Sequence, residues 1–310
     1  MRDLLVTLLF CYGGIKALRY PFIAALLWTW IGLMNPHRLG WGFAYNLPFA
    51  MISVGLLVIS MMAHPKLVRW PSSGPVKVLV CFLAWMGITT LAAFHVPESA
   101  TSYVNVLKVL GVTLLVGCVI RTREEILAFI AVTVLSVAFF GIKGGAFTLM
   151  TGGAYRVWGP PDSVIADNNE LAIALVVSIP LLYYLILRAE ELVKLPMMSR
   201  LSPKWIKRFL FVSIGLCAAS VLGSHSRGAM LAMSSMAVML WWRSKSKLTI
   251  GIVLLLLAPA LIMFMPSEWG ERMGTIKTYD ADASAMGRLN AWTMAFNIAN
   301  SRILGAGFAT

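Results

Sequence analysis

Residues 209–242 read FLFVSIGLCAASVLG, then SHSRG, then AMLAMSSMAVMLWW, so two apolar runs are joined by a short polar turn. Neither run contains a charged residue. The same pattern recurs along the 310-residue chain, which is 59% hydrophobic and 13% charged with a mean hydropathy of +0.80. A soluble domain carries about 25% charged residues. The sequence therefore predicts an all-α, polytopic transmembrane helical bundle.

We predict about nine or ten spans from the apolar runs. The runs are residues 20–34, 44–63, 77–94, 104–120, 124–141, 169–187, 209–223, 229–242 and 248–265. A tenth run, 4–18, carries Asp3 near its start and has no small-residue cleavage site, so it is a short span or an interfacial helix rather than a signal peptide.

The basic residues predict the orientation, because short cytoplasmic loops collect Lys and Arg. Fourteen basic residues lie in four loops that alternate with loops carrying only four. The first set is Lys66, Arg69, Lys77, Arg121, Arg123, Arg188, Lys194, Arg200, Lys204, Lys207, Arg208, Arg243, Lys245 and Lys247; the second is Arg38, Lys143, Arg156 and Arg227. Residues 188–208 and 243–247 are thus predicted to be cytoplasmic, and 142–168, 224–228 and 266–310 periplasmic, in a bacterial inner membrane.

The net charge of +13 and the four cysteines do not indicate other partners. No basic face interleaves with exposed aromatic residues, so no nucleic-acid partner is predicted. The cysteines lie inside apolar runs without metal-ligand spacing, so neither a disulfide framework nor a zinc site is indicated. A metal at Asp162, Asp167 and Glu170 is a weak alternative, and no cofactor is predicted.

The turn Ser224–Gly228 is the first candidate site. The two runs beside it have about 15 residues each, whereas a span needs about 20, so we predict that the turn lies below the outer membrane surface. Arginine at that depth costs roughly 2.5–3.5 kcal/mol unless it faces a polar cavity or a partner. An anionic ligand would suit Arg227; the alternative is a snorkelling arginine that anchors the turn. His225 could bind substrate or act as a base, or it could hydrogen-bond within the turn.

The predicted external loop 142–168 is the second candidate. Tyr155, Arg156 and Trp158 could hold a sugar face and a phosphate, although aromatic residues also anchor proteins at membrane interfaces. Asn168 and Asn169 stand at the mouth of the next helix, where they could bind substrate. Alternatively, Asp167 or Asn168 caps that helix.

The segment after Pro266 carries four acids and four bases and is too polar to span. Its apolar residues recur at helical spacing, which predicts a periplasmic amphipathic helix that begins near Arg288 and ends before Gly305 and Gly307. These apolar residues are Leu289, Trp292, Phe296, Ala299 and Ile303. Arg288 could share a cavity with Arg227, or it could be an exposed surface residue.

Four stretches carry a resemblance to a known family: 33–38 (LMNPHR), 167–172 (DNNELA), 224–229 (SHSRGA) and 287–292 (GRLNAW). Together they resemble the O-antigen ligase and Wzy-type polymerase superfamily, most closely the O-glycosylation ligases associated with exosortase A systems. The resemblance covers essentially the whole chain. It implies a membrane region over residues 1–165 and a ligase-like core over 166–310.

The resemblance implies metal-independent transfer of a glycan from a polyprenyl diphosphate carrier to the hydroxyl of a lipid or protein acceptor at the periplasmic face. Members hold the diphosphate with arginines that match Arg227 and Arg288 here, the expected catalytic residues. Guanidinium groups suit this role because they offer paired donors and a permanent charge. Arg156, Asn168, Asn169 and His225 are the expected substrate-binding residues.

Two alternatives to a ligase are a lipid-linked polysaccharide polymerase of the same superfamily and a transporter or flippase for an anionic lipid-linked glycan. A non-catalytic scaffold is a third. A transporter predicts paired inverted halves with broken helices near the midplane, whereas the interruption here is one-sided, which favours the ligase.

One departure from the resemblance concerns the C-terminal end. Such ligases place a histidine in a large periplasmic region after the Gly-Arg helix, followed by further spans. This sequence ends at Thr310 and has no histidine after His225. We therefore expect a C-terminally truncated member, inactive alone.

Overall fold

The computed structural model describes residues 1–196, 198–244, 247–248, 251 and 283–308. These residues form helices and connecting segments, and none of those described forms a strand. The predicted all-α fold is confirmed. The expected apolar run 248–265 and the charged stretch up to residue 282 lie almost wholly outside the described residues.

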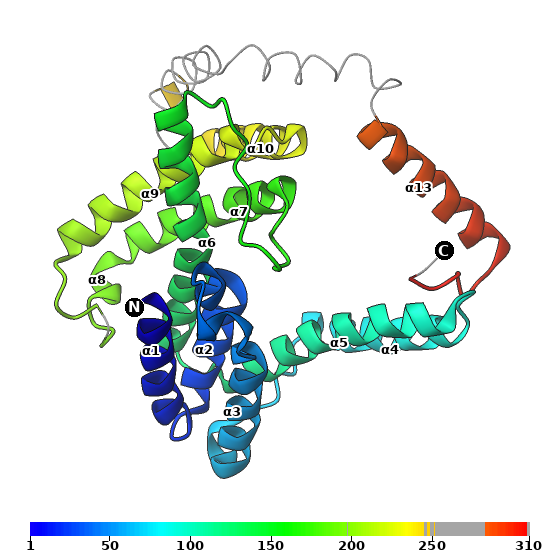
Figure 1. Cartoon of the computed structure of the whole chain (residues 1–310), viewed down its shortest axis with the longest axis horizontal. Helices are drawn as coiled ribbons and strands as arrows, with labels where there is room; N and C mark the ends of the chain where they lie inside the picture. The colour runs from blue at the N-terminus through cyan, green and yellow to red at the C-terminus, as the bar shows by residue number, and fades with distance from the viewer. Residues whose placement is uncertain (197, 245–246, 249–250, 252–282, 309–310) are drawn as a thin grey trace. The chain divides into compact units, whose positions relative to one another are not determined.

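The described helices fall on the predicted runs, although some of their ends differ (Figure 1). They are α1 (Arg2–Ala17), α2 (Pro21–Met34), α3 (Phe49–Ala63), α4 (Gly74–Leu91), α5 (Val96–Val119), α6 (Arg123–Thr151), α7 (Asn168–Leu187), α8 (Ala189–Leu192), α9 (Pro203–Gly223), α10 (Arg227–Arg243) and α13 (Ala283–Ser301), with the short 3-10 helices η1 (Pro36–Leu39), η2 (Phe43–Asn46) and η3 (Pro65–Leu67).

Five helices in the described part of the chain are long and apolar enough to cross a membrane: α4, α5, α6, α7 and α9. Two shorter helices, α2 and α3, are also apolar. The chain is a multi-pass membrane protein. The total number of spans and the orientation stay predictions.

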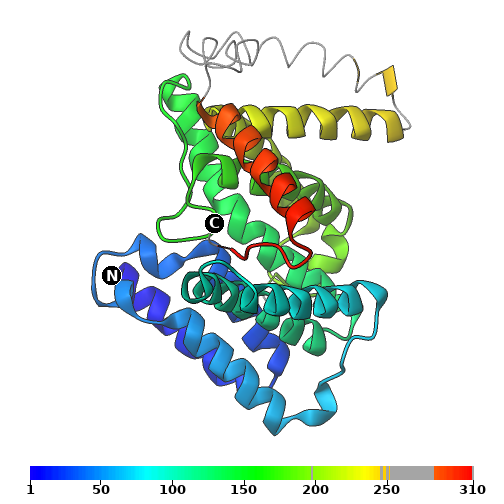
Figure 2. The same cartoon turned by 90° about the vertical axis from the view of Figure 1, so that its right-hand side faces the viewer.

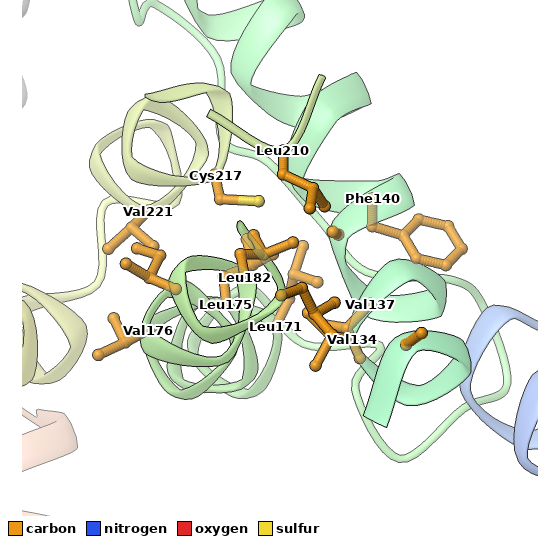
Figure 3. Packing of buried hydrophobic residues seen from close by; sticks show 14 of the residues in the cluster. Val134, Val137, Phe140, Leu171, Leu175, Val176, Leu182, Leu210, Cys217 and Val221 are labelled. Atoms are coloured by element: carbon orange, nitrogen blue, oxygen red, sulfur yellow. The ribbon is translucent and has the colours of Figure 1, made fainter. Parts of the chain in front are cut away.

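The chain divides into two compact units. The first contains residues 1–57 and 122–274, and the second contains residues 58–121 and 275–310. In the first unit α6, α7 and α9 contact one another. Leu171, Leu175 and Leu182 of α7 point into the space shared with α6 and α9 and are fully buried (Figure 3).

Glycines bring α6 and α9 close together. Gly141, Gly144 and Gly145 lie on one face of α6, and a Cβ atom on Gly145 would collide with the backbone carbonyl of Leu216 in α9. A Cβ atom on Gly144 would lie 2.5 Å from the Ser220 hydroxyl. Small residues are typical of packed transmembrane helices because lipid offers no hydrophobic drive for their association, so close backbone approach supplies the contact.

Three predicted boundaries were wrong by six residues or more. α5 begins at Val96, eight residues before the predicted start at 104. The predicted helix 124–141 continues to Thr151, where Gly152 ends it with a left-handed φ of 63°. The exposed Lys143 does not interrupt α6. Likewise α9 begins six residues before the predicted start, because Ser202 caps it and Pro203 takes its first position.

The longer α9 corrects the argument about depth. Its 21 residues rise about 1.5 Å each, so the helix is roughly 30 Å long, enough to cross the hydrocarbon core. The length of α9 therefore does not support the predicted recess of the turn, which stays a prediction. The turn is nevertheless buried, because other parts of the protein cover it.

The second unit contains α4 and α5 as a hairpin and also α13. The Tyr103 hydroxyl of α5 donates a 3.1 Å hydrogen bond to the carbonyl of Leu83 in α4. α13 confirms the helix expected around Arg288, and Trp292 and Phe296 are exposed along it. Whether this helix lies on a bilayer surface stays a prediction, and Ile303 lies beyond its end.

Candidate functional site

The hydroxyl groups of two serines stabilise the turn between α9 and α10. The Ser224 hydroxyl donates to the carbonyl of Val221 at 2.6 Å and accepts the Ser226 N–H at 3.2 Å. The Ser226 hydroxyl caps α10 by accepting the N–H of Ala229 at 3.3 Å. Only 1% of each serine is exposed. This geometry fixes Arg227 at the first helical position of α10, where its side chain is half-buried.

His225 fastens the turn to the loop that follows α6. Its backbone has a left-handed φ of 55°, which is uncommon for a residue with a side chain. The ring Nε2 lies 2.9 Å from the carbonyl oxygen of Gly153. A carbonyl only accepts hydrogen bonds, so Nε2 carries the proton and donates. His225 thus has a structural contact, but with the loop rather than within the turn as the alternative had it, and its expected contact with substrate stays a prediction.

Two further hydrogen bonds tie the same loop to the turn. The Val157 N–H donates to the carbonyl of Gly223 at 3.0 Å. The Asn168 side-chain amide donates to the carbonyl of Ser224 at 2.7 Å, and Asn168 is buried. The loop is closed within itself by a 2.9 Å bond from the Gly159 N–H to the carbonyl of Ala166. The turn therefore rests on a firmly attached loop.

The start of α7 is capped by Asp167. Its Oδ1 accepts hydrogen bonds from the backbone N–H of Asn169 at 2.8 Å and from the Asn169 side chain at 2.9 Å. The backbone bond is the main reason why the pKa of the Asp167 carboxyl is below its usual 3.8. The capping alternative is confirmed for Asp167. The expected substrate contact of Asn169, which is half-buried, stays a prediction.

The predicted loop residues Tyr155, Arg156 and Trp158 are all exposed. The centre of the Tyr155 ring lies 6.2 Å from the centre of the Phe147 ring, near the end of α6. Arg156 makes no ion pair within the described part of the chain. Its charge therefore faces outward next to the covered turn, where an anionic ligand could reach it.

Arg227 and the start of α10 together favour an anion. Arg227 takes the first position of α10, so a permanent positive charge belongs to the residue at the positive end of the helix dipole. A phosphate or diphosphate group there would lower the energy of both. Arg288 lies on an exposed part of α13 in the second unit, and its sharing of one site with Arg227 stays a prediction.

One contact near this site was missed by sequence reasoning. The Arg38 guanidinium lies 3.3 Å from the Asp162 carboxylate at the tip of the loop and 4.5 Å from the centre of the Tyr45 ring. Arg38 belongs to the 33–38 stretch, but its partner lies 124 positions later in the chain, so no local pattern in the sequence indicates this contact. The neighbouring His37 is buried, and burial followed by the charge of Arg38 lowers its pKa below 6.5.

The acids of the loop have other partners than a metal. Asp162 pairs with Arg38, and Asp167 caps α7. Across the residues for which the structure gives positions, no three His, Cys, Asp or Glu side chains are placed to hold a metal ion.

Comparison with known families divides the chain at the end of α7. A family of unknown function, DUF5935, matches residues 1–189. The chain belongs to this family. The O-antigen ligase family (Wzy_C) matches residues 210–310 and supports the superfamily predicted from the four stretches. Comparison with curated proteins and with solved structures finds no match.

The two matched regions meet at the turn. The DUF5935 region contributes Gly153, Val157 and Asn168, and the O-antigen ligase region contributes residues 223–227. The ligase match indicates a membrane enzyme of the glycosyl-transfer type. The exosortase-associated subgroup and the domain division at residue 165 stay predictions.

Proposed function

We propose that the protein is a membrane glycan ligase that transfers a glycan from a polyprenyl diphosphate carrier to an acceptor hydroxyl at the periplasmic face. The observation that carries this proposal is the placement of Arg227. It stands at the first position of α10, on a buried turn tied down by three hydrogen bonds, inside the region that matches O-antigen ligases.

Arg227 would bind the diphosphate of the donor. Its planar guanidinium offers paired N–H donors to phosphate oxygens, and its charge cannot be lost. Charge grows on the diphosphate as the glycosyl bond breaks, so a fixed cation stabilises the leaving group. Arg288 would supply a second guanidinium to the same diphosphate.

The remaining predicted residues divide into two roles. Arg156 is exposed on the loop and is proposed to contact an anionic part of the substrate, with Asn169 nearby at the start of α7. Asn168 and His225 donate their hydrogen bonds to backbone carbonyls of the turn and the loop. We therefore propose that these two act by positioning Arg227.

A double-mutant cycle on Arg227 and Arg288 tests the proposal, with binding of a polyprenyl diphosphate to the purified protein as the readout. Each substitution by Ala should weaken binding by about 1.5–3 kcal/mol, the usual worth of a hydrogen bond to a charged group. Lysine should rescue only partly, because it keeps the charge and loses the fork. The two effects should not be additive if both residues grip one ligand.

Arg200→Ala is the matched control, because Arg200 is exposed and precedes the opposite end of α9. It removes the same charge and should leave binding unchanged. Wild-type binding in Arg227→Ala would refute the proposed function. Strict additivity would assign the two arginines to separate sites.

Arg156→Ala tests the contribution of the loop. Binding should weaken, while the yield of detergent-extracted folded protein stays the same. The yield should not change because the Arg156 side chain is exposed and forms no ion pair with an acid in the described part of the chain. A yield that falls together with binding would show instead that Arg156 anchors the loop.

A further inference from the structure

The segment that follows α13 packs against the turn between α4 and α5, all within the second unit (Figures 1 and 2). The Phe94 N–H donates to the carbonyl of Ala306 at 3.0 Å, and the Phe308 N–H donates to the hydroxyl of Ser99 at 3.1 Å. Ser99 and Ala306 are buried by this contact. Residues some 210 positions apart thus form one surface.

Two glycines permit the close approach. Gly305 and Gly307 have left-handed φ values of 67° and 89°. A Cβ atom on Gly307 would collide with Ala93 and would lie 2.6 Å from the Ser99 hydroxyl. The backbone of this segment is therefore seated directly on the turn.

A pocket of about 340 Å³ lies between this segment and α4. Trp85, Met86 and Thr89 of α4 form one wall, and Ala299 with residues 302–308 forms the other. The volume is in the range of sites that hold small ligands or the head group of a larger one.

Arg302 carries the charge of this pocket. Its Nη2 donates to the carbonyl of Ala92 at 3.1 Å, and its guanidinium stacks 4.4 Å from the centre of the Phe94 ring. These contacts hold the group in place without neutralising it. Among the residues that have described positions, no carboxylate lies within ion-pair distance of Arg302, and Glu98 in the first turn of α5 is exposed and does not pair with it. The remaining N–H groups can bind an anion.

α4 is long and apolar enough to cross a membrane, and such a span would put its end at Leu91, with the pocket beside it, near the membrane surface. Arg302 is bonded beside the end of α4 at Leu91, and Trp85 lies six residues earlier, about 9 Å along the helix. Tryptophan favours the interfacial layer, and arginine there meets lipid head groups. The pocket has the charge of Arg302 at the end near Leu91, and the apolar side chains of Trp85 and Met86 farther along α4. This arrangement matches a lipid whose phosphate contacts Arg302 and whose first methylene groups contact Trp85 and Met86.

We propose that this pocket binds the phosphate group of a membrane lipid, with Arg302 as the anion ligand and with Trp85 and Met86 against the start of the acyl or prenyl chain. The site belongs to the second unit alone. It therefore does not depend on the proposed role of Arg227.

Retention of phosphatidylglycerol by the purified full chain in neutral detergent, measured by native mass spectrometry, tests the proposal. Arg302→Gln should lower the affinity about tenfold or more, as expected for loss of a charge-assisted bond to phosphate. Diacylglycerol, which lacks the phosphate, should bind weakly to both proteins.

Two variants separate the site from general effects. Lys77→Gln removes one charge near the opposite end of α4 and should retain phosphatidylglycerol with the affinity of the wild type. Thr89→Phe fills the pocket while leaving every bond of Arg302 in place, and it too should reduce binding about tenfold. Equal losses in Lys77→Gln and Arg302→Gln, or wild-type binding in Thr89→Phe, would overturn the proposal.

A third arm distinguishes a lipid from free phosphate. Inorganic phosphate at the same concentration should not displace phosphatidylglycerol, because it lacks a chain to contact Trp85 and Met86. Displacement by inorganic phosphate would show that the pocket is a site for small anions and that the assignment to lipid is wrong.

Discussion

The side-chain amide of Asn168 donates a 2.7 Å hydrogen bond to the backbone carbonyl of Ser224, which lies 56 residues later in the chain. Both residues are buried. Asn168 belongs to the DUF5935 region, and Ser224 belongs to the O-antigen ligase region. The family of unknown function therefore supplies part of the support for the turn that carries Arg227.

Asn168→Ala should destabilise the protein by about 1–3 kcal/mol, because the Ser224 carbonyl loses its side-chain donor in a buried place. Chemical unfolding in detergent measures the change. Asn290→Ala is the control, since Asn290 is exposed on α13. A similar loss in both variants would mean that the buried bond contributes nothing specific.

Gly145→Ala should destabilise the protein by about 1–3 kcal/mol, since the new methyl group meets the backbone of Leu216 and pushes α6 from α9. Gly215→Ala should instead be neutral or stabilising by up to about 1 kcal/mol, because nothing lies near its Cβ position and alanine favours a helix. Thermal unfolding compares the pair. Equal behaviour of the two variants would show that α6 and α9 do not pack as described.

Asp167→Ala should cost about 0.5–2 kcal/mol through loss of the cap of α7. Asp167→Asn should cost much less, because its amide oxygen still accepts the hydrogen bond. The pKa of Asp167 is lowered on folding, so its stabilising effect is complete above the usual value of 3.8 and is lost as the pH falls through the lowered pKa. Unfolding measured against pH should show this acid loss in the wild type and not in Asp167→Asn.

Single cysteines test the predicted orientation in a background without the four native cysteines. Cysteine in place of the exposed Ala154 should react with an impermeant thiol reagent in intact spheroplasts, and cysteine in place of the exposed Ser199 should react only after lysis. The reverse pattern would invert the topology and place the turn at Arg227 on the cytoplasmic side.

The candidate site could be anticipated only in part. The Ser-Arg-Gly turn was visible because a polar sequence interrupts two apolar runs, and Asp167 was visible as a cap because capping depends on neighbours in sequence. The recess of the turn was predicted from a short helix of about 15 residues, and this reason was wrong because α9 has 21 residues. Basic residues lower the hydropathy at the start of α9, so its first six residues were not predicted as helix. Lys143 likewise lowers the hydropathy before the last turns of α6. Hydropathy does not distinguish a loop from a continuous helix whose long charged side chains extend to water.

The sequence by itself determined the all-α membrane class, the approximate positions of most helices, and the polar turn that contains Arg227, because hydropathy and turn chemistry act over a few neighbouring residues. The structure placed Arg227 at the first position of α10. Only the tertiary structure decided which backbone carbonyls His225 and Asn168 bind. It also decided that Asp162 pairs with Arg38, and that Arg302 lies against the Phe94 ring with no acidic partner among the described residues. These contacts join residues 56 to 208 positions apart. They exist because glycines let α6 approach α9 and let residues 305–308 lie on the turn after α4, and no local pattern in the sequence specifies which helices meet.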